Sequence, residues 1–190
     1  MKLILASKSP RRREILGAMG YTFDILVSEC DESYGSSISP REGVELLARR
    51  KGDAVASAYG LINEPDTVIV SSDTLVDLGG KALGKPETET EAADMLRALS
   101  GQVHYVHTGV AVRRGDTVYS GVATTAVYFR ELSEPEIAEY VASGEPMDKA
   151  GAYGIQGAAG KFVSHIEGDF DTVVGLSSVL VKELLCKICG

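Results

Sequence analysis

Hydrophobic residues follow two different periodicities along this chain. Apolar residues at every second position, or in short unbroken runs, predict strands at 3–6, 23–27, 67–70, 75–78, 81–83, 103–113, 117–130 and 161–166. Apolar residues three or four positions apart predict helices that begin near residues 10, 40, 89, 134 and 178. Strands that alternate with helices, followed by a long hairpin, predict an α/β fold with a mixed sheet and flanking helices.

Capping signals mark where the helices begin. Ser9 is suited to cap the first helix and Pro10 to occupy its first position, because proline has no N–H to leave unpaired there. Capping boxes, in which Ser or Thr is followed three residues later by Glu, start three more helices at 39–42, 88–91 and 133–136.

The first helix carries an unusual charge at its start. Arg11, Arg12 and Arg13 fill its first turn, where the helix dipole is already positive and an acidic residue would be the stabilising choice. Free backbone N–H groups at a helix start and the forked donors of arginine both bind phosphate. The pattern therefore indicates a phosphate site, and the alternative is a set of three solvated arginines.

Composition limits the class of protein. The chain has 190 residues, 44% of them apolar, which fits a single domain over 1–190 folded as two lobes around a cleft. No run approaches the roughly 20 apolar residues of a membrane span, and no signal peptide is recognisable, so we expect a cytoplasmic protein without a membrane partner. A net charge of −8 argues against nucleic acid as a partner, because such binding needs a basic surface.

The three cysteines argue for a reducing compartment. Cys30, Cys186 and Cys189 are too few for a disulfide framework. Cys186 and Cys189 form a Cys-x-x-Cys pair without a second pair, so they are either a zinc or redox site or, more simply, free thiols.

Two acidic residues lie where a ligand could reach them. Asp73 follows the predicted strand at 67–70, and open α/β sheets bind ligands just past the carboxyl ends of their strands. Glu32 belongs to an acidic loop, which is either part of the site or a solvated turn. Both carboxylates are hard oxygen ligands and can share a Mg²⁺ or Mn²⁺ ion.

Two lysines and a glycine-rich segment complete the candidates. Lys85 lies between a glycine and a proline, which restrict it. Lys51 lies near the apolar edge of its helix, where it points toward a cleft or extends its ammonium to solvent. The segment 148–160, which contains Gln156, lets the backbone approach a ligand closely or is a flexible loop.

These residue types fit polyphosphate chemistry. Cations offset the phosphate charge, carboxylates hold a divalent ion, and a base takes a proton from an attacking water. The chain has no Gly-x-x-x-x-Gly-Lys-Ser/Thr loop, which excludes a Walker-type NTPase.

Several motifs carry a resemblance to a known family. They are Leu5-Ala6-Ser7-x-Ser9-Pro10-Arg11-Arg12, Asp31-Glu32, Ser72-Asp73-Thr74, Gly84-Lys85-Pro86, Leu99-Ser100-Gly101, the segment from Asp148 to Gly157, and Val174-Gly175-Leu176. With them the chain resembles, nearly end to end, the Maf family of nucleotide pyrophosphatases, also called septum-formation proteins. The resemblance implies an inosine-triphosphatase-like fold, a homodimer, and hydrolysis of a nucleoside triphosphate between its α and β phosphates to the monophosphate and pyrophosphate.

The resemblance also implies roles for individual residues. Asp73 accepts the proton and, with Glu32 and Lys85, forms the catalytic group; Glu32 and Asp73 hold the metal; Ser7, Arg11, Arg12, Lys51 and Lys85 bind phosphates; Arg11, Thr74 and Gln156 set the substrate.

The last three residues match the branch of the family that acts on dTTP and UTP. The 7-methyl-GTP branch instead tends to have Trp, Gln and Glu at these positions. A neutral amide such as Gln156 both donates and accepts a hydrogen bond, as the imide edge of uracil or thymine requires. The alternatives are the same chemistry on another modified nucleotide, such as 7-methyl-GTP, and a nucleotide-binding regulator of septum formation.

Overall fold

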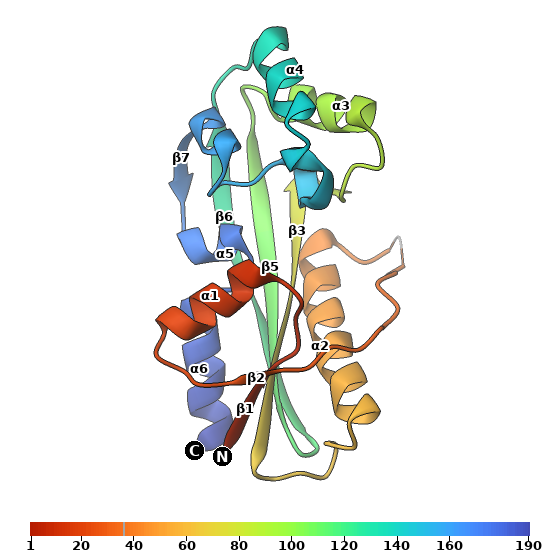
Figure 1. The fold of residues 1–190 in the computed structure, drawn as a ribbon, viewed down its shortest axis with the longest axis vertical. Helices are drawn as coiled ribbons and strands as arrows, with labels where there is room; N and C mark the ends of the chain where they lie inside the picture. Colours follow the sequence, from red (N-terminus) through yellow and green to blue (C-terminus); the bar gives the residue numbers. More distant parts are fainter. Residues whose placement is uncertain (36) are drawn as a thin grey trace. The chain divides into compact units, whose positions relative to one another are not determined.

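The fold is a mixed α/β arrangement built on one seven-stranded sheet with the strand order β2-β1-β3-β5-β6-β7, in which β4 pairs with β3 (Figure 1). The computed structural model describes residues 1–35 and 37–190. The strands are β1 (Lys2–Leu5), β2 (Asp24–Ile25), β3 (Thr67–Leu78), β4 (Lys81–Leu83), β5 (Val103–Arg114), β6 (Thr117–Phe129) and β7 (Val163–Glu167). The helices are α1 (Pro10–Ala18), α2 (Pro40–Ala58), α3 (Glu89–Leu99), α4 (Glu134–Ala142), α5 (Phe170–Val174) and α6 (Ser178–Cys189), with 3₁₀ turns η1 (Glu145–Asp148), η2 (Ala150–Ala152) and η3 (Ala158–Phe162).

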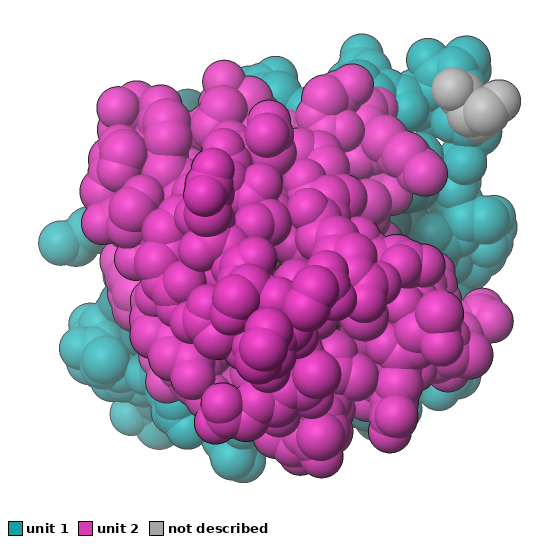
Figure 2. Space-filling view, turned by 90° about the horizontal axis from the view of Figure 1, so that it is seen from above, with its two compact units in different colours: residues 1–74, 108–123, 175–190 teal, residues 75–107, 124–174 magenta. Residues whose placement is uncertain are grey.

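The chain divides into two compact units, coloured separately in Figure 2. Unit 1 comprises Met1–Thr74, Thr108–Ala123 and Gly175–Gly190, and unit 2 comprises Leu75–His107 and Thr124–Val174. The long strands β3, β5 and β6 each contribute residues to both units. The sheet has parallel pairs at β1 and antiparallel pairs between β3 and β4 and between β6 and β7, so the predicted mixed sheet with flanking helices is confirmed.

Unit 1 begins with parallel strands. β1 pairs in parallel with β2 on one side and with β3 on the other. The crossovers through α1 and α2 run in opposite directions along the sheet, and right-handed crossovers then place the two helices on opposite faces, as Figure 1 shows. Ile4, Val55 and Ile69 are almost completely buried in the core between α2 and the sheet.

Unit 2 packs around an aromatic core. The rings of His104, Phe129 and Tyr153 meet edge to face, and Phe162 packs against Phe129. The His104 Nε2 lies 2.8 Å from the Tyr153 hydroxyl. Burial lowers the pKa of His104 to about 4, so the imidazole is neutral in the folded protein near pH 7.

The helix starts follow the predicted caps. The Ser9 side chain accepts from the Arg12 N–H, and Pro10 holds the first helical position. The capping box of Ser39 and Glu42 has both of its hydrogen bonds. At α3 the box is only half formed, because the Glu91 carboxylate accepts from the N–H of Glu87 instead.

Three predicted strands differ from the observed ones by more than a single residue at one end. The strand predicted at 23–27 shortens to β2, which has two residues, and the one predicted at 161–166 begins only at Val163, because η3 occupies the residues before it. The strand predicted to end at Val70 continues to Leu78, and the hairpin around Gly79 and Gly80 follows directly.

The remaining predictions concern cysteines and membranes. Cys30, Cys186 and Cys189 are free thiols. In the described part of the chain, no helix has the length and apolar character needed to cross a membrane.

Candidate active site

A half-buried arginine with several hydrogen bonds lies at the start of α1. The Arg12 guanidinium donates to the Gly175 carbonyl at 2.8 Å, to the Ser7 hydroxyl at 3.4 Å and to the Thr74 hydroxyl at 3.3 Å. Burial lowers the pKa of Arg12, while the charge of Asp73 opposes the shift, and the group remains a cation because arginine keeps its proton in proteins. Arg12 is therefore not a solvated surface arginine.

The charge of Arg12 is surrounded by neutral acceptors. Among residues 1–35 and 37–190, no carboxylate lies within salt-bridge distance of it. A half-buried cation held by hydroxyls and a carbonyl keeps its charge available to an anion, which is the arrangement expected at a phosphate site.

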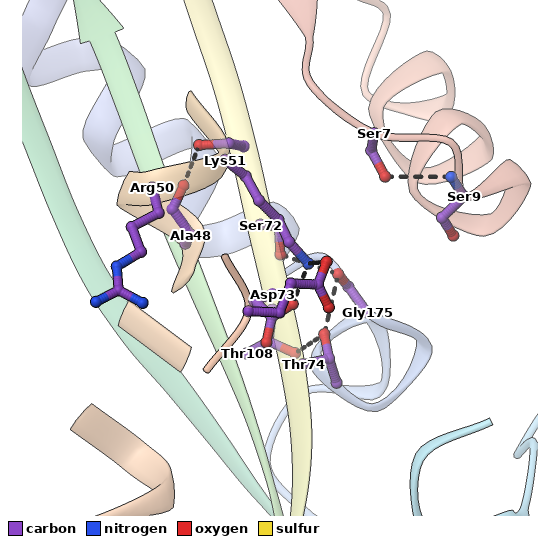
Figure 3. Close-up of polar contacts among 12 residues, drawn as sticks. Ser7, Ser9, Ala48, Arg50, Lys51, Ser72, Asp73, Thr74, Thr108 and Gly175 are labelled. Atoms are coloured by element: carbon purple, nitrogen blue, oxygen red, sulfur yellow. Dashed lines mark hydrogen bonds and ion pairs between the residues drawn. The ribbon is translucent and has the colours of Figure 1, made fainter. Parts of the chain in front are cut away.

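A second cluster joins Lys51 of α2, Asp73 of β3 and Glu32 of the loop before α2, and we call these three residues the Lys51 cluster. The Lys51 Nζ lies 2.5 Å from Asp73 Oδ1 and 3.0 Å from Glu32 Oε1. Figure 3 shows the lysine side chain reaching from α2 to the Asp73 carboxylate. Only 18% of the Lys51 side chain and 10% of the Asp73 side chain are exposed, against 66% for Glu32.

The pairing decides the protonation of Lys51. Burial alone would lower its pKa, but the charge of Asp73 and the hydrogen bonds to Asp73 and Glu32 outweigh this effect, so the pKa of Lys51 is raised. Lys51 is therefore protonated and positively charged near pH 7. Its ion pairs with Asp73 and Glu32 exclude the alternative in which its ammonium extends to solvent.

Asp73 corrects a prediction. It was predicted to follow the end of a strand, but it lies inside β3. The strand continues because its polar residues find partners in neighbouring segments: Ser71 donates to the Ala48 carbonyl at 2.6 Å, and Ser72 donates to the Gly175 carbonyl at 3.1 Å. Asp73 does lie just past the parallel part of β3, because the parallel pairing of β3 with β1 ends at Val70, three residues earlier.

Thr74 and Gly175 join these elements. The Thr74 hydroxyl lies 2.9 Å from the Thr108 hydroxyl on β5 and 3.4 Å from the Gly175 carbonyl (Figure 3). That carbonyl therefore accepts from Arg12, Ser72 and Thr74. Gly175 has φ +126°, a conformation that favours glycine. Sequence reasoning missed this role of Gly175, although the residue stands in one of the motifs quoted above.

The other predicted residues are placed as follows. Arg11 is half-exposed beside Arg12, and its side chain makes no hydrogen bond or ion pair with any described residue. Lys85 and Gln156 belong to unit 2 and are exposed. Within that unit the segment that carries Lys85 lies beside the glycine-rich segment that carries Gln156, because the Gly151 N–H donates to the Gly84 carbonyl at 2.9 Å.

The fit of a metal can be tested on the Lys51 cluster. Across the described residues, no group of three or more His, Cys, Asp or Glu side chains converges as a complete metal site. Glu32 and Asp73, however, point their carboxylates at one cation, the Lys51 ammonium. Mg²⁺ is commonly bound by one or two carboxylates together with substrate phosphates and water, so two convergent carboxylates fit it.

The fold and these clusters define an α/β protein with charged side chains gathered at the carboxyl end of a parallel strand, where such folds bind ligands. A sequence model of Maf-like proteins matches residues 2–188, and the chain belongs to this family.

Individual relatives are similar over most of the chain. A dTTP/UTP pyrophosphatase of Bacillus cereus (strain AH820) is 49% identical over 184 residues, which cover 96% of this chain and 94% of the relative. A dTTP/UTP pyrophosphatase of Geobacillus sp. (strain WCH70) is 50% identical over 175 residues, covering 92% and 91%. The solved structure of the Staphylococcus aureus Ham1 protein has a TM-score of 0.49 and 12% identity, covering 68% of this chain and 72% of that one.

Proposed function

We propose that the protein is a metal-dependent nucleoside triphosphate pyrophosphatase that hydrolyses dTTP and UTP to the monophosphate and pyrophosphate. The single observation that carries the proposal is the Lys51 cluster, in which two carboxylates share one ammonium. The names of the relatives at 49% and 50% identity support the choice of reaction and substrates.

The pairing of Lys51 suggests how the cluster works. A bound triphosphate competes for the Lys51 ammonium, because it carries several negative charges where a carboxylate carries one, and its oxygens accept strong charge-assisted hydrogen bonds. When Lys51 turns to the phosphate, it releases the Asp73 carboxylate. Asp73 is then free to accept a proton, and Ser7, Arg11, Arg12 and Lys85 hold the remaining phosphate charge.

The reaction needs one proton acceptor. The oxygen of a water molecule forms a bond to the α phosphorus, the bond from that phosphorus to the bridging oxygen breaks, and pyrophosphate leaves with the electron pair. Asp73 takes the proton of the water, as a general base does. A divalent cation held by Glu32 and Asp73 would supply neutralisation of the phosphate charge.

The choice of base is assigned to the three residues that match the dTTP/UTP branch of the family. Gln156 is proposed to read the imide edge of uracil or thymine, and Arg11 and Thr74 to complete the selection. The contacts of Thr74 with Arg12, Thr108 and Gly175 support a further role in holding the Arg12 guanidinium.

A pyrophosphate-release assay tests the proposal. Purified protein is given UTP, dTTP, CTP, GTP, ATP and 7-methyl-GTP with Mg²⁺ or Mn²⁺. We expect the highest kcat/KM for UTP and dTTP. A preference for 7-methyl-GTP would favour the other branch, and tight nucleotide binding without any turnover would favour a regulator. Light scattering of the eluted protein tests the homodimer that the resemblance implies.

A further inference from the structure

In the glycine-rich segment of unit 2, the backbone conformation of Gly157 is one that any residue could adopt, so another reason must explain the glycine. Gly151 has φ +68°, which favours glycine, but Gly157 has φ −99° and ψ −156°, an extended conformation that any residue adopts. A Cβ at Gly157 would lie 2.0 Å from Glu145 Oε1 and 2.6 Å from Glu145 Cδ. The glycine therefore makes room for the Glu145 carboxylate.

This carboxylate is held between two donors. The Tyr140 hydroxyl donates to Glu145 Oε1 at 3.0 Å, and the Ala158 N–H donates to Oε2 at 3.2 Å. The Tyr140 oxygen in turn accepts from the Gly154 N–H at 3.3 Å. Burial, aided by the bond to Glu145, raises the pKa of Tyr140, so the phenol keeps the proton that it donates.

Glu145 and Tyr140 therefore bind both ends of one turn. We call the residues from Gly154 to Ala158 the Gln156 turn, since Gln156 lies at its centre. Lys149 supports the same turn, because its side chain packs against Gly154 and its ammonium donates to the Glu145 carbonyl at 2.8 Å. These contacts all lie within unit 2.

The Gln156 side chain depends on this backbone. It is exposed, and no residue in the described part of the chain offers it a hydrogen bond. Its direction is then set by the turn alone. An amide that reads a base by paired hydrogen bonds must be held within a fraction of an ångström, so the rigidity of the turn bears on selectivity.

We propose that Glu145 is a positioning residue that fixes the Gln156 turn and thereby sets the preference for uracil and thymine nucleotides. The proposal rests on the proposed function in one respect only, namely that Gln156 reads the base. The alternative is that Glu145 contributes to folding and has no effect on selectivity.

Kinetics with Glu145→Ala and Glu145→Gln test the selectivity. We expect kcat/KM for UTP to fall roughly 10-fold relative to GTP, mainly through KM, because the paired hydrogen bonds to the base are lost. Glu139→Gln, an exposed glutamate on α4, is the matched control and should behave as the unmodified protein. An equal fall for UTP and GTP in both Glu145 variants would overturn the selectivity role.

Double variants ask whether Glu145 acts through Gln156. The ratio of UTP to GTP turnover in Glu145→Ala/Gln156→Ala should equal that of Gln156→Ala within about 2-fold, since residues coupled through a shared backbone segment are not additive. Gly157→Ala should mimic Glu145→Ala, because the new Cβ displaces the carboxylate, and adding Gly157→Ala to Glu145→Ala should change nothing further. Fully additive losses in these pairs would contradict the proposal.

Amide hydrogen exchange separates this inference from the proposed function. Exchange at Gly154 and Ala158 should rise at least roughly 10-fold in Glu145→Ala and in Gly157→Ala, with no change in Glu139→Gln. This readout needs no turnover. If the unmodified protein hydrolyses no nucleotide, the proposed function fails while exchange still tests the positioning role; unchanged exchange in both variants overturns the positioning role even if the enzyme is active.

Discussion

The Lys51 cluster and the Gln156 turn differ in how their parts are held. Glu32, Lys51 and Asp73 are held by ion pairs between side chains, which can exchange partners when another anion arrives. The Gln156 turn is held through its backbone, by one carboxylate and one phenol. The difference predicts a division of labour, in which changes to the cluster affect every triphosphate and changes to the turn affect which base is accepted.

Removal of divalent ions should have the largest effect. Without a cation, the triphosphate would meet the carboxylates of Glu32 and Asp73 as like charges, so exhaustive chelation should abolish turnover of every nucleotide. Pyrophosphate release is measured before and after chelation, with metal content checked by elemental analysis, and after Mg²⁺ is restored. Full activity in metal-free protein would contradict a metal role for the cluster.

Asp73→Asn should lower turnover by roughly 10²-fold or more for all nucleotides alike, because it removes the group that we propose as general base and as one metal ligand. The amide also loses the charge that pairs with Lys51, although it keeps nearly the same size. Turnover of UTP and GTP is compared with nucleotide affinity, which we expect to persist. Turnover within a few-fold of the unmodified protein would rule out Asp73 as the base.

Acid should weaken the core of unit 2. The pKa of His104 in the folded protein, about 4, lies below its usual value near 6.5, so the unfolded chain binds a proton first as pH falls. The free energy of unfolding is therefore highest above about pH 6.5, and the protonation of His104 in the unfolded chain lowers it by roughly 3 kcal/mol in all as pH falls toward 4. Urea unfolding at pH 7 and pH 4.5 measures this decrease in the free energy of unfolding.

The matched control for this prediction is a variant in which His104→Leu is combined with Tyr153→Phe, so that neither partner is left unpaired in the core. Its unfolding free energy should depend less steeply on pH in this range. The same slope in both proteins would show that other groups cause the acid sensitivity.

Gln156→Glu should change the selectivity among bases and leave the chemistry at the phosphates unchanged. A carboxylate only accepts hydrogen bonds, so it would face a carbonyl oxygen of uracil without a donor, at a cost of about 1–3 kcal/mol. We expect kcat/KM for UTP and dTTP to fall roughly 10- to 100-fold, with a much smaller change for GTP and 7-methyl-GTP. An equal fall for all four nucleotides would make the Gln156 turn a scaffold and remove the contrast with the Lys51 cluster.

Local signals explain which parts of the structure were predictable. Ser9 and Ser39 cap helices through residues three positions away, so the sequence window contains both partners. The continuation of β3 through Ser71 and Ser72 was not predictable in the same way. Their partners, the carbonyls of Ala48 and Gly175, are 23 and 103 residues distant along the chain.

The candidate site shows the same limit. The residue types of Asp73, Lys51 and Glu32 suggested phosphate chemistry, but their mutual contacts depend on how α2 packs against β3. A Cβ at Gly52 would lie 2.8 Å from the Ser71 hydroxyl, so this close approach needs a glycine that no local pattern singles out. The role proposed for Glu145 was not predictable from the sequence either, because the side chain that a Cβ at Gly157 would meet belongs to a residue twelve positions earlier.

The smallest expected effect comes from the cap of the helix that carries Lys51. Ser39→Ala removes the hydroxyl that accepts from the Glu42 N–H, which should lower stability by about 1 kcal/mol and the melting temperature by about 2–4 °C. Lys51 lies twelve residues further along α2, about three turns from the cap, and its ion pairs hold it independently of the first turn. Thermal unfolding and pyrophosphate release from UTP and GTP are therefore measured on the same preparation, and we expect a lower melting temperature with kcat/KM within about 2-fold of the unmodified protein for both nucleotides. A large loss of activity with little change in melting temperature would mean that the position of Lys51 depends on the helix start, and the Lys51 cluster would then depend on backbone placement as the Gln156 turn does.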